Sequence, residues 1–402
     1  MQTNRSSSAL LPLLQAYCIK SLSIRRTNLV KAKFDREAFL QAANVVNSVV
    51  PSRTPRPILE NLRLVVADNT ARLQATDLET IGLTLELRSV QVDEPGDILL
   101  PAAQLVQMLR ALTDEEIQLE SSQRGVTISG EYSEYELPIE DPELYPEVAE
   151  FEEGNSHQIQ AEVLRRLIER VSFATAQESF RYAMNGVLWE LEGEKVRLVA
   201  TDGRRLAVAD GIGMLHGKHA SEGTPVVPTR AMTILERNLG DPAEPVFVRL
   251  RAQDCLFRTS RLVLHARLVE GRFPPYREVI PKNVQAKVTL TAGPLLAAVR
   301  QAAVVADPER GQGVDLTFHK NKLVIEASSQ ERGGRAKVQV PIEYGGEKLE
   351  VRFNPRFLTD MLSVLDADQE LVFEYQGREK AAAFRVGSDY LYVVMPMSRE
   401  GA

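Results

Sequence analysis

One pattern of strand, polar turn and strand occurs three times along this chain, and it restricts the possible folds more than any other feature. Its copies are LQATDLETIGLTLEL (73–87), LVATDGRRLAVADGI (198–212) and LVIEASSQERGGRAKVQV (323–340). The alanine before each turn recurs after 125 residues, from Ala75 to Ala200, and after 127 residues, from Ala200 to Ala327. Similarity at a fixed period is typical of a structural unit repeated in tandem. The chain therefore contains three copies of one unit of about 120 residues.

Helical patterns flank each copy. Apolar residues three and four apart predict one helix before each turn, in residues 35–50, 161–175 and 293–306. A second helix is predicted after each turn, with proline in its opening turn, where a missing N–H costs least, in residues 101–112, 228–239 and 354–365. Runs such as KVRLVA alternate apolar and polar residues, which predicts half-buried strands. The expected fold class is α+β, with helices packed on largely antiparallel sheet.

The beginning of the chain differs from the repeats. Residues 1–34 contain six basic residues and no acid, whereas acidic residues are frequent from Asp35 onward. The stretch SALLPLLQAYCI is too broken by Pro12 and Gln15 for a secretory signal, although an acid-free start rich in Ser and Arg also resembles a transit peptide. We expect residues 1–29 to be a poorly ordered basic extension. The expected domains are residues 30–150, 151–281 and 282–402.

Composition excludes several classes of protein. Hydrophobic residues make up 44% and charged residues 26% of the chain, as in ordinary globular domains. No uncharged run is long enough to cross a bilayer. The two cysteines, Cys18 and Cys255, lie 237 residues apart, which favours a reducing cytoplasm and predicts neither a disulfide framework nor a metal site. The net charge of −7 argues against indiscriminate binding to nucleic acid.

Positive charge is nevertheless concentrated on the six predicted helices. Counted over residues 36–48, 101–112, 161–175, 228–239, 294–305 and 354–365, they carry nine arginines, five acidic residues and no lysine. The rest of the chain is therefore more acidic than the whole. One interpretation is an ordinary solvated helix surface with i,i+4 ion pairs. The other is a positive surface that attracts phosphate where the helices gather.

The sequence lacks the motifs of common enzymes. It contains no G-x-x-x-x-G-K-[ST], G-x-G-x-x-G, H-E-x-x-H or G-x-S-x-G. The histidines are scattered, and His216 and His219 lie in GIGMLHGKH, which predicts a surface turn and not a metal site. Asp202 is expected to bond its own backbone in a turn, because ATD also occurs at residues 75–77. Trp189 lies in a strand-like run and is expected in the core.

Five motifs follow one another along residues 30–398. They are SRTPRPILENL (52–62), RYAMNG (181–186), VATDGRRLAV (199–208), EGRFPPYREVIPKN (270–283) and YVVMPM (392–397). Together and in this order they resemble the sliding clamps, the β subunits of bacterial DNA polymerase III. The chain departs from the family pattern at Pro275 and Glu278, and it continues past Met397 as SREGA.

The resemblance implies a DNA sliding clamp without catalytic activity that gives the polymerase its processivity. It implies a head-to-tail homodimeric ring of six similar domains, with helices lining the hole, sheets outside and duplex DNA encircled without sequence preference. No cofactor is implied. The implied protein partners are the catalytic subunit of DNA polymerase III, the clamp loader, other polymerases, ligase and mismatch-repair proteins, which bind through short peptide motifs.

Helix dimensions favour a dimer independently of the resemblance. Helices ~10 Å apart would close a six-helix ring of ~60 Å circumference, whose hole of ~10 Å is too narrow for a duplex. Twelve helices from two chains give a circumference of ~120 Å and a hole of ~28 Å, which is wide enough for a duplex.

The resemblance also implies which residues form the contacts between subunits. They are two residues of the first domain and two of the third, which could otherwise be ordinary core residues: Tyr135, Leu137, Val304 and Val305.

Two further sets of residues are predicted. Contacts to DNA phosphates are expected from Arg53, Arg110, Arg165, Arg166, Tyr182, Arg230 and Lys282. A pocket for partner peptides is expected between the second and third repeats, formed by Met184, Thr201, Gly203, Arg204, Arg205, Leu206, Pro274, Val279, Asn354, Phe357, Val393, Val394, Met395, Pro396 and Met397.

The physical case for this pocket begins at the apolar end VVMPM. Pro396 has no N–H, so a strand should end before it or lie at a sheet edge. The two methionines give an adaptable surface, unless they complete the core of the third repeat. Arg205 is expected to hold a polar group at the rim, above an apolar floor formed by Leu206 and Val394.

Two other functions remain open. The three repeats could be separate peptide-binding modules of a scaffold that forms no ring and binds no DNA. An enzyme built on a triplicated fold is less well supported, because no nucleophile or base has an orienting partner in the sequence.

Overall fold

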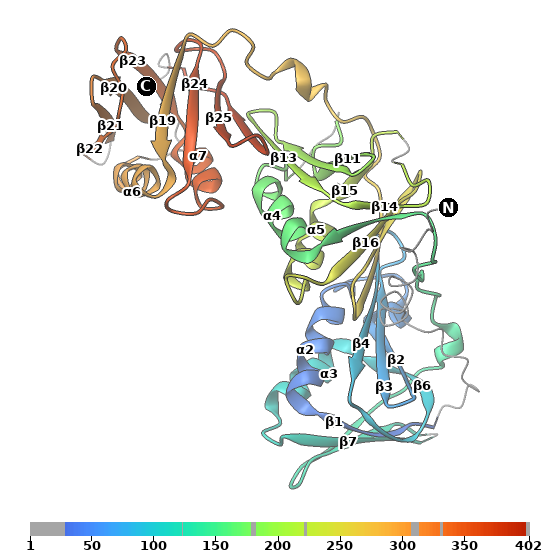
Figure 1. Cartoon of the computed structure of the whole chain (residues 1–402). Coiled ribbons are helices and arrows are strands. Elements are labelled where there is room, and N and C mark those ends of the chain that lie inside the picture. The colour runs from blue at the N-terminus through green and yellow to red at the C-terminus, as the bar shows by residue number, and fades with distance from the viewer. Residues whose placement is uncertain are drawn as a thin grey trace, which may run out of the picture. The chain divides into compact units, whose positions relative to one another are not determined.

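The computed structural model describes residues 29–122, 124–177, 182–220, 223–306, 313–329 and 333–398 (Figure 1). The predicted basic extension lies outside these ranges, except for Leu29. All six predicted helices and the strand pair of each repeat are present, and the α+β fold class is confirmed. The chain divides into two compact units. The first contains the described residues of 1–161, 214–219 and 237–268, and the second those of 162–213, 220–236 and 269–402.

The first unit is built on two antiparallel sheets. The larger sheet has the order β14-β10-β16-β17-β18-β4-β3-β2-β6 and the smaller one the order β5-β1-β7-β8-β9. The strands are β1 (Lys31–Asp35), β2 (Asn61–Ala67), β3 (Thr70–Thr76), β4 (Ile81–Arg88), β5 (Gln91–Glu94), β6 (Gly96–Pro101), β7 (Glu116–Ser121), β8 (Val126–Ser129), β9 (Glu134–Leu137), β10 (Ser156–Gln160), β14 (Met214–His216), β16 (Pro245–Leu250), β17 (Asp254–Arg258) and β18 (Leu262–Arg267).

Helices α2 (Arg36–Asn47) and α3 (Ala102–Ala111) pack against each other in the first unit. Helix α2 begins where Oδ1 of Asp35 accepts a hydrogen bond from the backbone N of Ala38 at 2.7 Å, which satisfies one of the free N–H groups of its first turn. The rings of Phe34 and Phe39 stack at 4.4 Å and are buried. Short 3-10 turns occur at η1 (Pro57–Glu60) and η2 (Pro142–Leu144).

The second unit also contains two antiparallel sheets. Their orders are β15-β11-β12-β13-β26-β25-β24-β19 and β22-β21-β20-β23. The strands are β11 (Gly186–Glu192), β12 (Lys195–Thr201), β13 (Arg205–Ile212), β15 (Val226–Pro228), β19 (Ala286–Thr291), β20 (Val314–His319), β21 (Lys322–Ser329), β22 (Gly334–Pro341), β23 (Leu349–Phe353), β24 (Glu370–Tyr375), β25 (Ala382–Val386) and β26 (Tyr390–Val394).

The four remaining helices contain most of the arginines that the sequence analysis counted on helices. They are α4 (Ala161–Ser172), α5 (Thr229–Arg237), α6 (Ala292–Ala303) and α7 (Pro355–Leu362), with a 3-10 turn at η3 (Tyr276–Glu278).

The prolines predicted in the opening turns of three helices differ in placement. Pro355 opens α7, but Pro101 is the N-cap of α3 and Pro228 ends β15 just before α5. The prediction of proline inside the first turn is therefore correct only for α7, because strands run directly into the other two helices.

Strands of neighbouring repeats share a sheet. In the first unit, β18 of the second repeat pairs with β4 of the first, from Leu262 opposite Leu85 to Ala266 opposite Ile81. In the second unit, β26 of the third repeat pairs with β13 of the second. The second repeat therefore contributes strands to both compact units.

Several predictions for single residues can now be compared with the structure. Trp189 is fully buried, as expected. Asp202 and Asp77 both accept hydrogen bonds from backbone N–H groups of their own turns, which confirms the turn-forming role. Cys255 is buried, and burial raises the pKa of its thiol. Among the described residues, no helix has the length and apolar character needed to span a membrane.

The prediction of a surface turn at His219 is wrong. This side chain is buried, and its Nδ1 lies 2.7 Å from Nδ1 of the fully buried His157. The backbone N of Leu250 donates to Nε2 of His219 at 2.9 Å. His216 lies in a strand, with Nε2 2.9 Å from Oε1 of Gln158. The reason is the pairing of β14 with β10, which brings this glycine-rich stretch against the sheet.

Candidate functional site

A short turn between β12 and β13 begins the candidate site. Oδ1 of Asp202 accepts hydrogen bonds from the backbone N of Arg204 at 2.9 Å and of Arg205 at 3.0 Å. Oγ1 of Thr201 accepts from the backbone N of Gly203 at 3.1 Å and donates to the carbonyl of Arg205 at 2.6 Å. Gly203 has φ of +86°, which glycine adopts without steric cost. The turn fixes the start of β13 and presents Arg205 at its first position.

The last strand of the chain supplies the floor beside this turn. Leu206 of β13 lies opposite Val393 of β26. Leu206, Val393 and Val394 are all buried, with exposed fractions of 2%, 3% and 0%. These three side chains therefore form part of the core.

The segment after β26 leaves the core. Strand β26 ends at Val394, two residues before Pro396, as the missing N–H of proline predicts. The backbone N of Met395 donates to the carbonyl of Arg204 at 2.9 Å, and that of Met397 donates to the carbonyl of Arg352 at 2.8 Å. The side chain of Met395 is 45% exposed. This exposure speaks against a purely structural role for Met395 in the third repeat.

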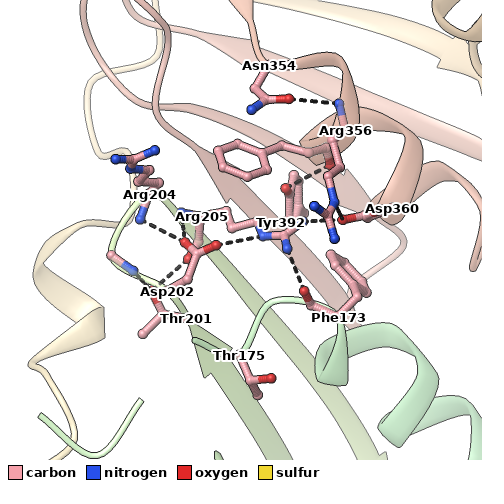
Figure 2. A network of polar contacts seen from close by, with 12 residues as sticks. Phe173, Thr175, Thr201, Asp202, Arg204, Arg205, Asn354, Arg356, Asp360 and Tyr392 are labelled. Atoms are coloured by element: carbon pink, nitrogen blue, oxygen red, sulfur yellow. Dashed lines mark hydrogen bonds and ion pairs between the residues drawn. The ribbon is translucent and has the colours of Figure 1, made fainter. Parts of the chain in front are cut away.

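Arg205 lies at the centre of a polar network (Figure 2). Its Nε donates to Oδ2 of Asp202 at 2.9 Å, its Nη1 to Oδ2 of Asp360 at 2.6 Å, and its Nη2 to the carbonyl of Phe173 at 2.6 Å. Burial by itself would lower the pKa of Arg205, but the bond to Asp360 and the neighbouring charges raise it above its ordinary value. The guanidinium therefore stays charged although its side chain is 8% exposed.

This geometry corrects the expectation for Arg205. The sequence suggested a rim residue free to hold a polar group of a ligand. In the structure, all three guanidinium nitrogens are engaged within the chain, because α7 brings Asp360 and the end of α4 brings Phe173 to the same place. Arg205 therefore joins elements of the second and third repeats.

Helix α7 covers the other side of Arg205. The ring centroid of Phe357 lies 4.6 Å from Cζ of Arg205, within the range of a cation–π contact. Oδ1 of Asn354 accepts from the backbone N of Arg356 at 2.9 Å and caps the helix. The hydroxyl of Tyr392 donates to the carbonyl of Phe357 at 2.9 Å, and burial raises the pKa of Tyr392. The predicted residues Asn354 and Phe357 thus lie beside the turn.

The remaining predicted pocket residues adjoin one apolar cluster. Ala183, Phe273 and Ile280, which flank Met184, Pro274 and Val279 in the sequence, pack in the cluster that also contains Leu206 and Val393. Val279 itself is 54% exposed. Met184, Pro274 and Val279 are thus next in sequence to residues of one apolar core. Val279 and Met395 are the exposed apolar residues of the predicted set.

Three residues of the site were not predicted. Phe173 and Asp360 contact Arg205, and Tyr392 contacts Phe357, which covers Arg205. Tyr392 opens the YVVMPM motif but was not assigned to the pocket, whereas Phe173 and Asp360 belong to no motif used in the prediction. Asp360 has the ordinary pattern of a solvated helix acid. Its role depends on the packing of α7 against a strand of another repeat, which local sequence does not reveal.

The corresponding junction in the first unit has a different chemistry. The backbone N of Arg267 donates to the carbonyl of Thr80, in the turn before β4, at 2.8 Å. The backbone N of Met395 makes the equivalent hydrogen bond to the carbonyl of Arg204, in the turn before β13. In this register His265 and Arg267 take the places of Val393 and Met395. The pocket there, of about 320 Å³, is also lined by three acidic residues: Glu79, Glu147 and Asp254. The junction of the second and third repeats therefore carries apolar Val393 and Met395 where the first unit carries His265 and Arg267.

The predicted DNA contacts are distributed over both units. Arg53 and Arg110 belong to the first unit and the other five residues to the second. Arg110 lies in the last turn of α3, and Arg166 and Arg230 are exposed on α4 and α5. Lys282 is exposed in the segment before β19. All six arginines and lysines of this set lie in helices or loops, and none lies within a strand.

The predicted subunit contacts lie at two places. Tyr135 and Leu137 belong to β9, with exposed fractions of 37% and 8%. Val304 is the C-cap of α6 and is 82% exposed. Val305 is half-buried and lies close to Gly334 of β22. A Cβ atom at position 334 would be only 3.3 Å from Cγ1 of Val305. The exposed members, Tyr135 and Val304, are the ones available to another molecule.

No group of three or more His, Cys, Asp or Glu side chains able to hold a metal ion occurs in the part of the chain that the structure describes. The polar network around Arg205 contains no nucleophile paired with a base. Its hydrogen bonds join the turn before β13 to α7 and to the end of α4.

Comparison with known proteins agrees with these features. Family models of the DNA polymerase III β subunit match in three consecutive parts: the N-terminal domain at residues 30–149, the central domain at 158–275 and the C-terminal domain at 277–398. The β sliding clamp of Pseudomonas putida is 31% identical over 90% of this chain and 98% of its own length. That of Escherichia coli is 31% identical over 92% of this chain and 100% of its own length.

Solved structures give the same result. The sliding clamp of Pseudomonas aeruginosa, crystallised with griselimycin, has a TM-score of 0.83 and 29% identity over 92% of this chain and 99% of that chain. The clamp of Bacillus subtilis, at 23% identity and a TM-score of 0.84, shows the same fold. The three repeats are therefore three clamp domains, and the chain belongs to the β sliding clamps, the non-catalytic processivity factors of bacterial DNA polymerase III.

Proposed function

We propose that two copies of this chain join head to tail into a cytoplasmic ring that encircles duplex DNA. In this proposal, the site beside β13 and β26 tethers proteins that act on DNA. One observation carries the ring. Among the described residues, β9 is paired only with β8, and β22 only with β21, so each leaves one strand edge open.

The order of strands supports pairing between these two edges. Within the chain, strands β16-β17-β18 continue into β4-β3-β2, and strands β24-β25-β26 continue into β13-β12-β11. The corresponding strands at the two remaining ends are β7-β8-β9 and β22-β21-β20. Joining β9 of one chain to β22 of another would create a third sheet that continues across a junction, with the same order of strands as the two internal ones. Open edges that match in this way favour strand addition.

The internal junctions also predict how far the pairing extends. Strand β18 covers Ile81–Leu85, the first five residues of β4, and β26 covers residues 205–209, the first five of β13. By analogy, β9 would cover residues 334–338 of β22. Val304 lies at the end of α6, which packs on β22, so its 82% exposed side chain would be near the partner subunit. Tyr135 lies on β9 itself.

Contacts to DNA in this proposal are electrostatic. The exposed arginines of α3, α4 and α5 would face phosphates, with Arg53, Tyr182 and Lys282 nearby. Such contacts should be few and bridged by water, because phosphate contacts carry no sequence information and a clamp must slide. The overall net charge of −7 is compatible with weak binding of this kind.

Partner proteins would bind as short extended peptides over Leu206 and Val394. Exposed Met395 and Val279 offer adaptable apolar contacts, and the buried Arg205 network keeps the turn and α7 in place below them. We propose the catalytic subunit of DNA polymerase III, the clamp loader, other polymerases, ligase and mismatch-repair proteins as the partners. One site that accepts several peptides would make these partners compete.

The ring can be tested by native mass spectrometry at low micromolar concentration. The unmodified chain should be a dimer, and Val304→Asp should be a folded monomer, because it places a charge in the proposed apolar interface. Ile212→Asp is the matched control, since Ile212 is 73% exposed and lies outside the proposed contact. A monomeric unmodified chain would support a non-ring scaffold instead. A Val304→Asp variant that remains dimeric would place the subunit contact away from Val304.

A further inference from the structure

The first strand of each repeat has a different neighbour in the third repeat. In the first two repeats an added strand covers its outer edge: β5 covers β1, and β14 covers β10. In the third repeat β19 is the last strand of its sheet, and among the described residues it pairs only with β24. Strand β19 therefore has an outer edge without a partner strand.

The chain after β22 explains why this edge stays open. In the second repeat, the segment after β13 continues into β14 and reaches β10. In the third repeat, the backbone N of Ile342 donates to the carbonyl of Asn321 at 3.3 Å, and the backbone N of Asn321 donates to the carbonyl of Tyr344 at 2.8 Å. The segment is thus bonded to the turn between β20 and β21. It cannot at the same time pair with β19.

A groove of about 570 Å³ lies beside the open edge. Its apolar lining includes residues of β19, the first turn of α6, β21, the end of β22 and the residue after β22: Leu290, Pro294, Leu295, Leu323, Val340 and Ile342. The charged residues of its lining are Glu343 and Glu370, both exposed, and the lining contains no lysine or arginine. The groove therefore combines a strand edge, apolar side chains and uncompensated negative charge.

We propose that the outer edge of β19 binds an extended segment of a partner protein as an added strand, with apolar side chains alternating with lysine or arginine. Alternate backbone groups of an edge strand point away from its neighbour and can bond a further strand. Main-chain hydrogen bonds provide affinity in this mode of binding, and alternate side chains provide specificity. Glu343 and Glu370 select the basic residues of that segment.

This site is separate from the peptide site beside β13 and β26, which lies at the opposite end of the same sheet's third-repeat strands. It is also compatible with the proposed ring. Pairing of β9 with residues 334–338 would leave Val340, Pro341 and the segment that follows uncovered. The proposal therefore depends neither on the ring nor on the tethering site.

The test uses the full chain and a fluorescein-labelled peptide, acetyl-Gly-Lys-Val-Lys-Val-Lys-Val-Gly-amide, in fluorescence anisotropy. The peptide should bind saturably and slow hydrogen exchange in residues 286–291. A version N-methylated at alternate residues cannot pair along one edge and should bind at least tenfold more weakly. Glu343→Lys combined with Glu370→Lys should also weaken binding at least tenfold. The matched control, Glu192→Lys combined with Glu194→Lys on the β11–β12 hairpin, should bind like the unmodified chain.

Several results would overturn the proposal. These are no saturable binding, equal binding of the N-methylated peptide, or an equal loss in the control pair. Sedimentation of the unmodified chain gives a separate check. If β19 edges of two copies pair with each other, the unmodified chain will form a larger assembly than the Thr289→Pro variant. Proline at this exposed position of β19 blocks pairing along the outer edge, so this difference would assign the edge to self-association.

Discussion

Asp360 on α7 accepts a 2.6 Å hydrogen bond from Nη1 of Arg205 on β13 (Figure 2). This single ion pair joins a helix of the third repeat to a strand of the second. The two side chains are 27% and 8% exposed, respectively, so water screens the pair only in part. A buried guanidinium that loses a partner retains its charge and its desolvation cost.

Asp360→Ala should therefore lower the free energy of unfolding by about 2 kcal/mol, the range for hydrogen bonds to charged groups. Urea denaturation measures this loss. Asp368→Ala removes an exposed acid of the same segment and should change stability by less than about 0.5 kcal/mol. Equal effects of the two substitutions would show that the Arg205 network does not stabilise the junction.

Acid should destabilise the protein through the His157–His219 pair. Burial lowers the pKa of His219, so the folded state keeps it neutral while the unfolded chain takes up a proton near pH 6.5. The free energy of unfolding should decrease as pH falls below about 6.5, by at most about 1.4 kcal/mol per pH unit for this group. Above that pH the group contributes no pH dependence.

Urea denaturation between pH 7.5 and 5.5 checks this prediction. His219→Gln should flatten the decrease, whereas His319→Gln, which changes a half-buried histidine of β20, should preserve it. An unchanged pH profile in His219→Gln would assign the acid sensitivity to other groups.

Binding to DNA should be topological. Clamps placed on circular DNA by a clamp loader should stay bound through a high-salt wash, because salt weakens phosphate contacts and does not open a ring. Cutting the circle should release them. Gel filtration of labelled clamp with each form of DNA measures retention, and equal loss from both forms at high salt would contradict encirclement.

The end of the chain should be needed for partner peptides but not for folding. Removing residues 395–402 deletes the backbone bonds of Met395 and Met397 to Arg204 and Arg352, which together should cost about 1–2 kcal/mol of stability. Peptide binding, measured by anisotropy, and processive synthesis should be lost, while the native mass stays that of a dimer. Unaltered affinity in the truncated protein would place the peptide pocket elsewhere.

Repetition made most of the fold predictable from the sequence. The turns at Asp77 and Asp202 and the strands around them follow from local chemistry, and the six helices follow from apolar spacing. Pairing between repeats was not predictable in this way. The joining of β18 to β4 and of β26 to β13 depends on contacts between residues more than 150 positions apart, which no local pattern records.

The candidate site was predictable only in part, for the same reason. Pro396 correctly predicted the end of β26, and the motifs led to the residues that gather beside the turn. The burial of Arg205 was not foreseen, because its partners Asp360 and Phe173 come from two other elements. Similarly, His219 lies in a glycine-rich stretch that is typical of a turn, yet pairing with β10 converts part of that stretch into a strand.

The sharing of sheets between repeats has a consequence for dissecting this protein. A repeat excised at its sequence boundaries would lose the neighbour that covers β4 or β13 and would display a bare hydrogen-bonding edge flanked by apolar side chains. Such fragments should associate with one another or precipitate. The smallest fragment suited to study in isolation therefore contains one junction between repeats, together with the half of each repeat that forms it. In a single excised domain, the newly exposed strand edge would dominate the measured behaviour.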